Sequence, residues 1–192
     1  MSKEIVLASA SPRRRQLLSS LGLDITVVPS CHEERITSKG VISSIVMDMA
    51  EQKAQSVADR YPDSIVIGAD TIVVIDGKIL GKPSAKDEAA QMLESLSGRW
   101  HSVFTGIALI NMQSDTLLKD FEQSNVKFKH LSELEIKKYI ETGEPMDKAG
   151  AYGIQGIGAL LVEKIEGCYY NIVGLPLFKL NQMLSRFNAQ IL

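Results

Sequence analysis

The stretch 65-IVIGADTIVVIDGKIL-80 decides the fold class of this chain. The run Ile65–Ile75 is apolar at almost every position, which is typical of a strand buried within a sheet. Asp76-Gly77 is a strong two-residue turn signal for a β-hairpin, and Lys78–Leu80 supplies the returning strand. The sheet must therefore contain antiparallel pairs.

Upstream of this stretch, strands and helices alternate. Ser11-Pro12 supplies an N-cap and a first-turn proline for a helix that Gly22 ends. We expect strands at residues 5–8 and 24–28, and an amphipathic helix at 43–60 with Ile45, Met49, Lys53, Ala54 and Val57 near one face. Together with the hairpin, this order predicts an α/β fold with a mixed twisted sheet and flanking helices.

Downstream, two capping signals mark helix starts. Ser84 with Asp87 predicts a helix through Leu96, and Ser132 with Glu135 predicts one to about Thr142. We further expect strands near 102–110 and 116–129, a late strand from Gly158 to Ile165, and a closing helix at 176–187. The 192 residues predict a single domain spanning 1–192, in which two lobes share one core.

Composition excludes several classes of protein. The chain is 45% hydrophobic and 23% charged, which argues against disorder. Lys and Arg total 21 against 23 Asp and Glu without a long basic block, so nucleic acid is not an expected partner. No apolar run suits a signal peptide or the ~18 residues of a membrane span, so no membrane partner is expected. The two cysteines, Cys31 and Cys168, fit a reducing compartment, and we expect a cytoplasmic protein.

The segment Ser9-Ala10-Ser11-Pro12-Arg13-Arg14-Arg15 places cations at the start of a helix, where the helix dipole disfavours them. An anion bound among them would resolve this conflict, because backbone N–H groups and arginine forks suit a polyphosphate. The alternative is that these basic side chains extend into solvent.

Asp70 is a lone carboxylate within the apolar run. A buried carboxylate is costly unless it becomes protonated or gains a cation, and both outcomes are common at active sites. Gly68 has no side chain, and we expect it to let a ligand come close. The alternative is an Asp that caps a turn at the end of a strand.

Four weaker candidate residues are charged. Glu33 and Glu34 lie in a loop after the second strand and could offer oxygen ligands to a divalent cation, although adjacent glutamates usually mark a solvated turn. Lys53 and Lys82 are either surface lysines or functional cations, and the short loop Gly81-Lys82-Pro83 favours Lys82.

The segment 144-EPMDKAGAYGIQGIG-158 is rich in glycine, which indicates either a close approach of a ligand to the backbone or a cluster of tight turns. It lacks the G-x-G-x-x-G spacing of dinucleotide-binding folds, and the chain has no P-loop and no G-x-S-x-G elbow.

Taken together, the motifs resemble those of the Maf family of nucleoside triphosphate pyrophosphatases, also called septum formation inhibitors. They are 7-LASASPRR-14, 68-GADT-71, 81-GKP-83, 97-SGR-99 with His101, Val103 and Thr105, and residues 144–158. The resemblance runs in order from residue 5 to about 176. It implies a cleft between two lobes, hydrolysis between the α- and β-phosphates with a divalent cation, Mg²⁺ or Mn²⁺, and a homodimer.

The resemblance also implies roles for single residues. Asp70 matches the general base, and the other catalytic or phosphate-binding positions are matched by Ser9, Arg13, Arg14, Glu34, Lys53 and Lys82. Arg13, Thr71 and Gln155 resemble the specificity set of the dTTP/UTP branch, whereas the 7-methyl-GTP branch has Gln and Glu where Thr71 and Gln155 stand. Cys31-His32-Glu33 departs from the family pattern, which leaves open whether Glu33 or Glu34 binds metal.

These expectations combine into one hypothesis. The arginines bind the triphosphate, Glu34 and Asp70 hold the metal, Asp70 deprotonates the attacking water, and Lys53 and Lys82 offset developing charge. Gln155 would recognise the O4/N3 edge of thymine or uracil. Two alternatives remain: activity on 7-methyl-GTP, and a non-catalytic nucleotide-binding regulator of septum formation.

Overall fold

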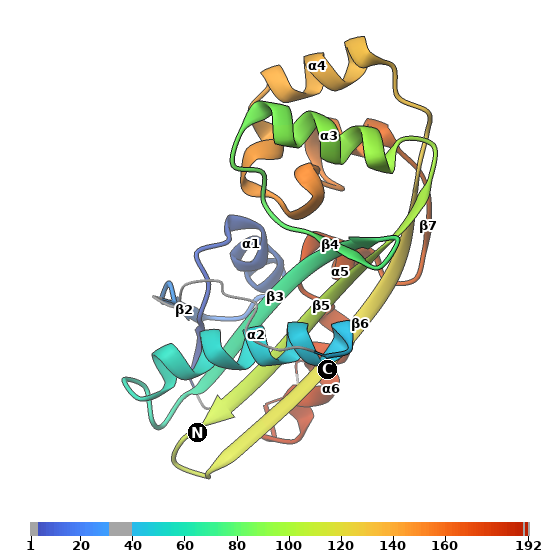
Figure 1. The fold of residues 1–192 in the computed structure, drawn as a ribbon. Helices are drawn as coiled ribbons and strands as arrows, with labels where there is room; N and C mark the ends of the chain where they lie inside the picture. Colours follow the sequence, from blue (N-terminus) through green and yellow to red (C-terminus); the bar gives the residue numbers. More distant parts are fainter. Residues whose placement is uncertain (1–3, 31–39, 190, 192) are drawn as a thin grey trace. The chain divides into compact units, whose positions relative to one another are not determined.

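A seven-stranded mixed sheet organises the fold, with strand order β2-β1-β3-β5-β6-β7 and β4 paired to β3 (Figure 1). The computed structural model describes residues 4–30, 40–189 and 191. The strands are β1 (Ile5–Leu7), β2 (Ile25–Val27), β3 (Ile65–Ile75), β4 (Lys78–Leu80), β5 (Trp100–Asn111), β6 (Thr116–Phe128) and β7 (Val162–Glu166). The α-helices are α1 (Pro12–Ser20), α2 (Ile42–Ala58), α3 (Lys86–Leu96), α4 (Glu133–Glu141), α5 (Tyr169–Val173) and α6 (Leu177–Ser185). The predicted α/β class with a mixed sheet and flanking helices is confirmed.

The chain divides into two compact units. Unit 1 comprises Met1–Asp70, Thr105–Glu122 and Gly174–Leu192, and unit 2 comprises Thr71–Phe104 and Gln123–Val173. Strands β3, β5 and β6 each contribute residues to both units. Among the described residues, no helix is long and apolar enough to cross a membrane.

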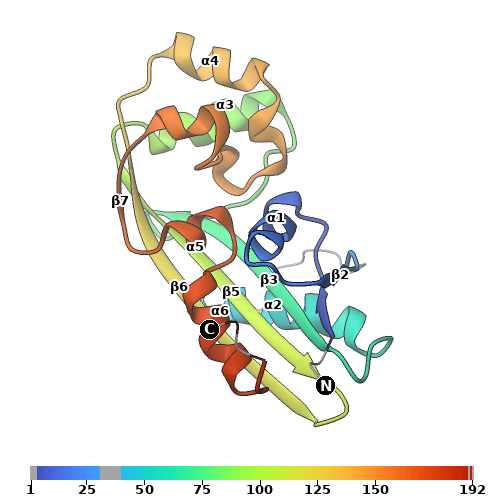
Figure 2. The ribbon, with the colours of Figure 1, turned by 180° about the vertical axis from the view of Figure 1, so that it is seen from behind.

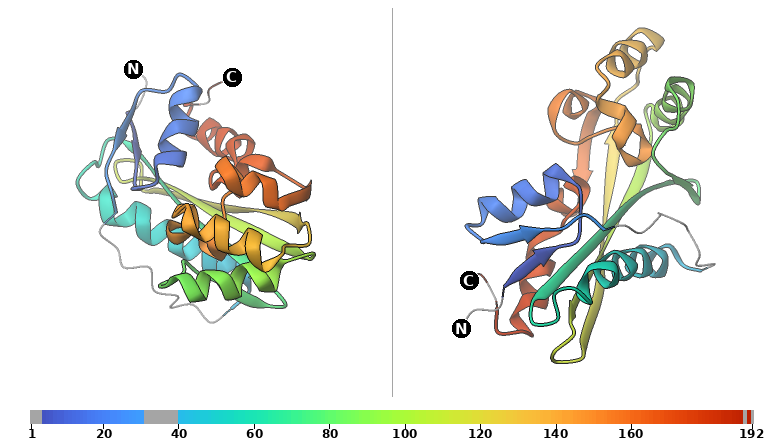
Figure 3. Two further views of the ribbon diagram at one scale, coloured as in Figure 1. Left: turned by 90° about the horizontal axis from the view of Figure 1, so that it is seen from above. Right: turned by 90° about the vertical axis from the view of Figure 1, so that its left-hand side faces the viewer.

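Unit 1 begins with two crossovers built around the central strand β1. β1 pairs in parallel with β2 on one side and with β3 on the other. α1 connects β1 to β2 and α2 connects β2 to β3, and Figure 3 shows the two helices on opposite faces of these strands. Two right-handed crossovers that run toward opposite edges of a sheet place their helices on opposite faces of it. The strand order therefore reverses between β1 and β3, at a topological switch point.

Helix α2 packs very closely against its face of the sheet, where Val6, Ala8, Val66, Ala108 and Ile110 meet Ala50, Ala54, Val57 and Ala58. Glycine makes this approach possible, since a Cβ on Gly68 would lie 2.1 Å from the carbonyl oxygen of Ala50. A Cβ on Gly106 would lie 2.2 Å from the carbonyl oxygen of Val46. The expectation that Gly68 admits a ligand is therefore wrong, because α2 covers it. Helix α6 lies on the opposite face of the sheet (Figures 1 and 2).

Unit 2 contains the predicted hairpin, in which β3 and β4 pair antiparallel. Asp76 and Gly77 have φ angles of 50° and 72°, the left-handed pair that a type I′ turn requires. Helices α3 and α4 lie beside the short 3₁₀ helices η1 (Glu144–Asp147) and η2 (Ala149–Ala151) (Figures 1 and 2). The Ser132–Glu135 capping box of α4 is present as predicted.

Two local predictions in unit 2 are wrong. Ala85, not Ser84, is the N-cap of α3, and Ser84 donates from its amide and hydroxyl to Glu88 rather than engaging Asp87. The late strand does not begin at Gly158, because η3 (Gly156–Leu161) occupies that stretch and β7 begins only at Val162. The amides of Ile157 and Gly158 donate to the Glu144 carboxylate and are therefore not available to a strand ladder.

Candidate active site

The carboxyl end of β1 and the middle of β3 lie together at the switch point of unit 1. The last pair of this ladder is Leu7 with Ile67, and the amide of Ala8 still donates to the Ile67 carbonyl at 2.8 Å. Ser9 follows the end of β1, and Asp70 lies three residues beyond Ile67 on β3. In open parallel sheets, ligands bind outside the carboxyl ends of the strands at such a point.

The loop between β1 and α1 is held by serine hydroxyls and by Arg14. Ser11 caps α1 by accepting from the Arg14 amide, and the Ser11 amide donates to the Ser9 hydroxyl at 3.2 Å. The Arg14 guanidinium donates to that same hydroxyl at 3.3 Å and to the carbonyl of Gly174 at 2.7 Å. Arg14 is only 8% exposed, so it does not extend into solvent as the alternative supposed. Arg13 is half-buried and Arg15 exposed, which leaves Arg13 more accessible than Arg14 to a ligand.

Asp70 is buried, as predicted, and forms an ion pair with Lys53. Lys53 comes from the sheet-facing side of α2, and Asp70 points to the same face of β3 as Gly68. Both side chains are nearly inaccessible, at 7% and 4% exposed, so each charge depends strongly on its partner. Because β3 continues to Ile75, Asp70 is not a strand-end turn cap. Because Lys53 is buried, the interpretation of it as a surface lysine is also wrong.

The predicted metal site lies partly beyond what the structure describes, since Glu33 and Glu34 fall in residues 31–39. Within residues 4–30, 40–189 and 191, no group of three or more His, Cys, Asp or Glu side chains could hold a metal ion. Asp70 offers one carboxylate, a hard oxygen donor. Magnesium bound with a nucleotide commonly uses one or two carboxylates, with phosphates and waters completing its shell. The donor at Asp70 therefore fits a metal that arrives with a triphosphate.

The remaining predicted site residues belong to unit 2. Thr71 follows Asp70 on β3 and is half-buried, whereas Lys82 is exposed in the loop after β4. The carbonyl of Gly81 accepts from the amide of Gly150 at 3.0 Å. This hydrogen bond joins the Lys82 loop to the glycine-rich segment that carries Gln155.

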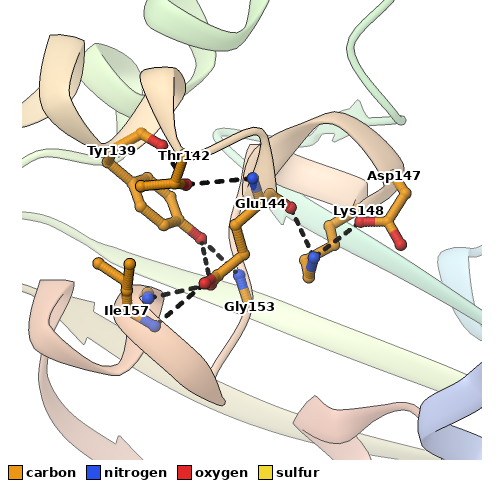
Figure 4. A network of polar contacts seen from close by, with 8 residues as sticks. Tyr139, Thr142, Glu144, Asp147, Lys148, Gly153 and Ile157 are labelled. Atoms are coloured by element: carbon orange, nitrogen blue, oxygen red, sulfur yellow. Dashed lines mark hydrogen bonds and ion pairs between the residues drawn. The ribbon is translucent and has the colours of Figure 1, made fainter.

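The glycine-rich segment is fixed by Glu144 and Tyr139 (Figure 4). The Glu144 carboxylate accepts from the amides of Ile157 and Gly158, each at 3.0 Å, and from the Tyr139 hydroxyl at 2.9 Å. The Tyr139 hydroxyl in turn accepts from the amide of Gly153 at 3.1 Å. Gln155 lies between these attachment points, half-buried, at the N-cap of η3. The alternative of tight turns is found here, since η1, η2 and η3 occupy this segment, and the close approach of a ligand to the backbone stays a prediction.

Tyr152 of this segment belongs to a buried aromatic cluster. His101 bonds the Tyr152 hydroxyl at 2.7 Å, and Phe128 contacts both rings edge to face. Burial lowers the pKa of His101 to about 4, so the ring is neutral at physiological pH. Sequence reasoning gave Tyr139 and Tyr152 no role. No sequence motif indicates that Tyr139 bonds Glu144 or that Tyr152 bonds His101, because both contacts depend on the fold.

The structure thus brings together Ser9 with Arg14 and Lys53 with Asp70 in unit 1, and the Lys82 loop with the Gln155 segment in unit 2. The model of the Maf-like protein family matches residues 4–187 of this chain.

Relatives extend the similarity over the full length. A protein of Dictyoglomus thermophilum (strain ATCC 35947 / DSM 3960 / H-6-12) named dTTP/UTP pyrophosphatase is 53% identical over 193 residues, covering 100% of each chain. One of the same name from Thermoanaerobacter sp. (strain X514) is 54% identical over 98% of this chain and 100% of its own. The solved Staphylococcus aureus Ham1 protein has a TM-score of 0.51 at 14% identity, over 83% of this chain and 80% of its own, which shows a likeness of fold alone. This chain belongs to the Maf-like protein family.

Proposed function

We propose that this chain is a nucleoside triphosphate pyrophosphatase that hydrolyses dTTP and UTP to the nucleoside monophosphate and pyrophosphate. Membership of the Maf-like family supports the enzyme class, and relatives named dTTP/UTP pyrophosphatase support the substrates. The structural observation that carries the proposal is the buried Asp70–Lys53 pair, in which Asp70 lies on β3 three residues beyond its last pairing with β1.

Phosphate binding is assigned to the β1–α1 loop and the cations near it. The guanidinium of Arg13, at the start of α1, binds phosphate oxygens, and Ser9 and Arg14 hold the loop in shape. The proposed role of Lys82 is to offset negative charge on the phosphates. A magnesium or manganese ion, with Asp70 and Glu34 as proposed ligands, supplies further neutralisation of the triphosphate when bound.

The chemical step is hydrolysis of the α–β anhydride bond. A water oxygen attacks the α-phosphorus, the bond from that phosphorus to the bridging oxygen breaks, and pyrophosphate leaves. The carboxylate of Asp70 accepts the proton of the attacking water, and the Lys53 ammonium beside it stabilises negative charge that develops on the phosphoryl oxygens. No covalent enzyme intermediate is required.

Base recognition is assigned to unit 2. The half-buried amide of Gln155 both donates and accepts, as the O4/N3 edge of thymine or uracil requires. Thr71 follows the general base directly in β3 and completes the specificity set together with Arg13.

The test measures pyrophosphate release from dTTP, UTP, the other common triphosphates and 7-methyl-GTP, with magnesium or manganese. We expect turnover of dTTP and UTP, and loss of at least about 10²-fold in Asp70→Asn, since general acid–base catalysis contributes about that much. Asp115→Asn is the matched control, because Asp115 is exposed in the β5–β6 turn with φ 48°, which Asn tolerates. Full activity in Asp70→Asn contradicts the assignment. Preference for 7-methyl-GTP indicates the other branch, and binding without turnover indicates a regulator.

A further inference from the structure

Tyr139 and Glu144 take no part in the proposed chemistry, yet their side chains attach to the backbone on both sides of Gln155. On one side, the amide of Gly153 donates to the Tyr139 hydroxyl. On the other side, the amides of Ile157 and Gly158 donate to the two oxygens of the Glu144 carboxylate. The Tyr139–Glu144 hydrogen bond links these two attachments into one network, shown in Figure 4.

The segment is shaped closely around this carboxylate. Gly156 has a φ of +67°, and a Cβ there would lie 2.8 Å from a Glu144 oxygen. A Cβ on Gly158 would lie 2.2 Å from the carbonyl oxygen of Gly153. Side chains at positions 156 and 158 would clash with Glu144 and with the Gly153 carbonyl in this conformation, so these glycines and the carboxylate form one structural arrangement.

Burial and further hydrogen bonds hold Tyr139 and Glu144 in place. Tyr139 is 3% exposed, and burial raises the pKa of its hydroxyl, so it remains protonated and donates to Glu144. The amide of Glu144 donates to the Thr142 hydroxyl at 3.1 Å, and the Lys148 ammonium donates to the Glu144 carbonyl at 2.5 Å. Support of this kind is how a binding group is held to within a fraction of an ångström.

We infer that Tyr139 and Glu144 are positioning residues that set pyrimidine selectivity by holding Gln155 in the orientation that recognises the base. The inference rests on the proposed function, because it assigns a cause to the selectivity of that site. The side chains of Tyr139 and Glu144 act through the backbone of residues 153–158 and do not touch the nucleotide.

The experiment compares Glu144→Gln and Tyr139→Phe with the wild type. Each variant loses hydrogen bonds to the segment, and losing one such bond to a charged group is worth about tenfold. We expect kcat/KM for dTTP and UTP to fall about tenfold through KM, with kcat within about threefold, since binding rather than chemistry is affected. Activity on GTP should change much less. Glu163→Gln and Tyr170→Phe, at exposed positions, are the matched controls.

A double variant separates positioning from a merely structural effect. If Glu144 acts through Gln155, then Glu144→Gln should cause little further loss of selectivity in a Gln155→Ala background. An undiminished further loss there, or an equal fall for every nucleotide through kcat, overturns the inference. If Glu144→Gln does not fold, Tyr139→Phe decides, because it removes a single hydroxyl.

Equilibrium binding distinguishes this inference from the proposed function. If the wild type releases no pyrophosphate, the proposed function fails, and calorimetry with dTMP and GMP then tests the positioning. Weaker binding of dTMP with unchanged binding of GMP in Glu144→Gln supports it. Equal changes for both nucleotides, or no dTMP binding by the wild type, overturn it.

Discussion

Asp70 in unit 1 is a buried carboxylate and Glu144 in unit 2 a half-buried one, and different kinds of partner satisfy them. Asp70 pairs with the ammonium of Lys53, a charged group from another element. Glu144 accepts from backbone amides and a tyrosine hydroxyl, all of them neutral donors. A charge pair responds to an incoming polyanion and metal, whereas a set of neutral donors fixes a backbone. We therefore propose that the Asp70 region takes part in the reaction and that the Glu144 region fixes the conformation of the backbone.

The largest expected effect on stability comes from removing the cation in the first region. Lys53→Met leaves Asp70 buried without its partner, which should cost about 3–5 kcal/mol in the free energy of unfolding. Lys53→Met with Asp70→Asn should recover most of that loss, because neither charge remains. Lys148→Met in unit 2, where the ammonium meets Asp147 and the Glu144 carbonyl, should cost only about 1 kcal/mol.

Urea denaturation of the four proteins measures these differences. A Lys53→Met variant as stable as the wild type, or a double variant no more stable than the single one, contradicts the importance of the charge pair. An equal cost for Lys148→Met removes the contrast between the two regions.

A second contrast concerns the glycines of the two regions. A Cβ on Gly68 would meet backbone atoms of Ala50 and Ala54, at 2.1 and 2.7 Å, so α2 would have to move. A Cβ on Gly156 would meet the end of the Glu144 side chain, which can shift, although its φ of +67° still costs energy. We expect Gly68→Ala to destabilise the chain by about 3 kcal/mol and Gly156→Ala by about 1 kcal/mol.

Thermal unfolding together with dTTP hydrolysis checks this prediction. Gly68→Ala should also lower kcat, because the displaced α2 carries Lys53. Gly40→Ala is the matched control, since nothing lies within 4 Å of a Cβ there. A greater loss of stability in Gly156→Ala than in Gly68→Ala would reverse the contrast.

Much of the fold could be predicted because its signals are local. The Ser11–Pro12 cap, the Asp76–Gly77 turn and the Ser132–Glu135 box each join residues a few positions apart, and all three are present. The prediction that Ser84 caps this helix is wrong because Ser84 bonds Glu88 rather than Asp87. The five-residue α5 helix is too short to leave a periodic pattern.

The candidate site could be predicted in part. The burial of Asp70 follows from its aliphatic neighbours in sequence, but its pairing with Lys53 depends on the path of α2 over β3. That path also places Gly68 beneath the helix, which reverses its predicted role. The strand expected from Gly158 failed because a distant carboxylate, Glu144, captures the amides that a strand would use. The proposed roles of Glu34 and of the metal remain predictions, and Glu34 lies outside the described residues.

A further expected effect, absent at neutral pH, is a pH dependence of stability that belongs to unit 2. His101 titrates near pH 6.5 in the unfolded chain, and burial lowers its pKa to about 4 in the folded one. Between these values the unfolded state binds more protons, so stability falls as the pH is lowered, by about 1.4 kcal/mol per unit. The neutral form is fully stabilising above pH 6.5.

His101→Gln, which keeps an amide able to bond Tyr152, should lose this component. Urea denaturation at pH 7, 6 and 5 measures the difference between the two proteins, which should shrink as the pH falls. A difference independent of pH would show that His101 is not responsible.

The hydrogen bond from Arg14 to the carbonyl of Gly174 spans 160 residues of sequence. During synthesis, Arg14 leaves the ribosome early, long before its acceptor exists. The β1–α1 loop can therefore reach its folded arrangement only after Gly174 has been translated, because the Arg14 side chain needs that acceptor. Products truncated before Gly174 therefore lack the acceptor of the buried Arg14 side chain.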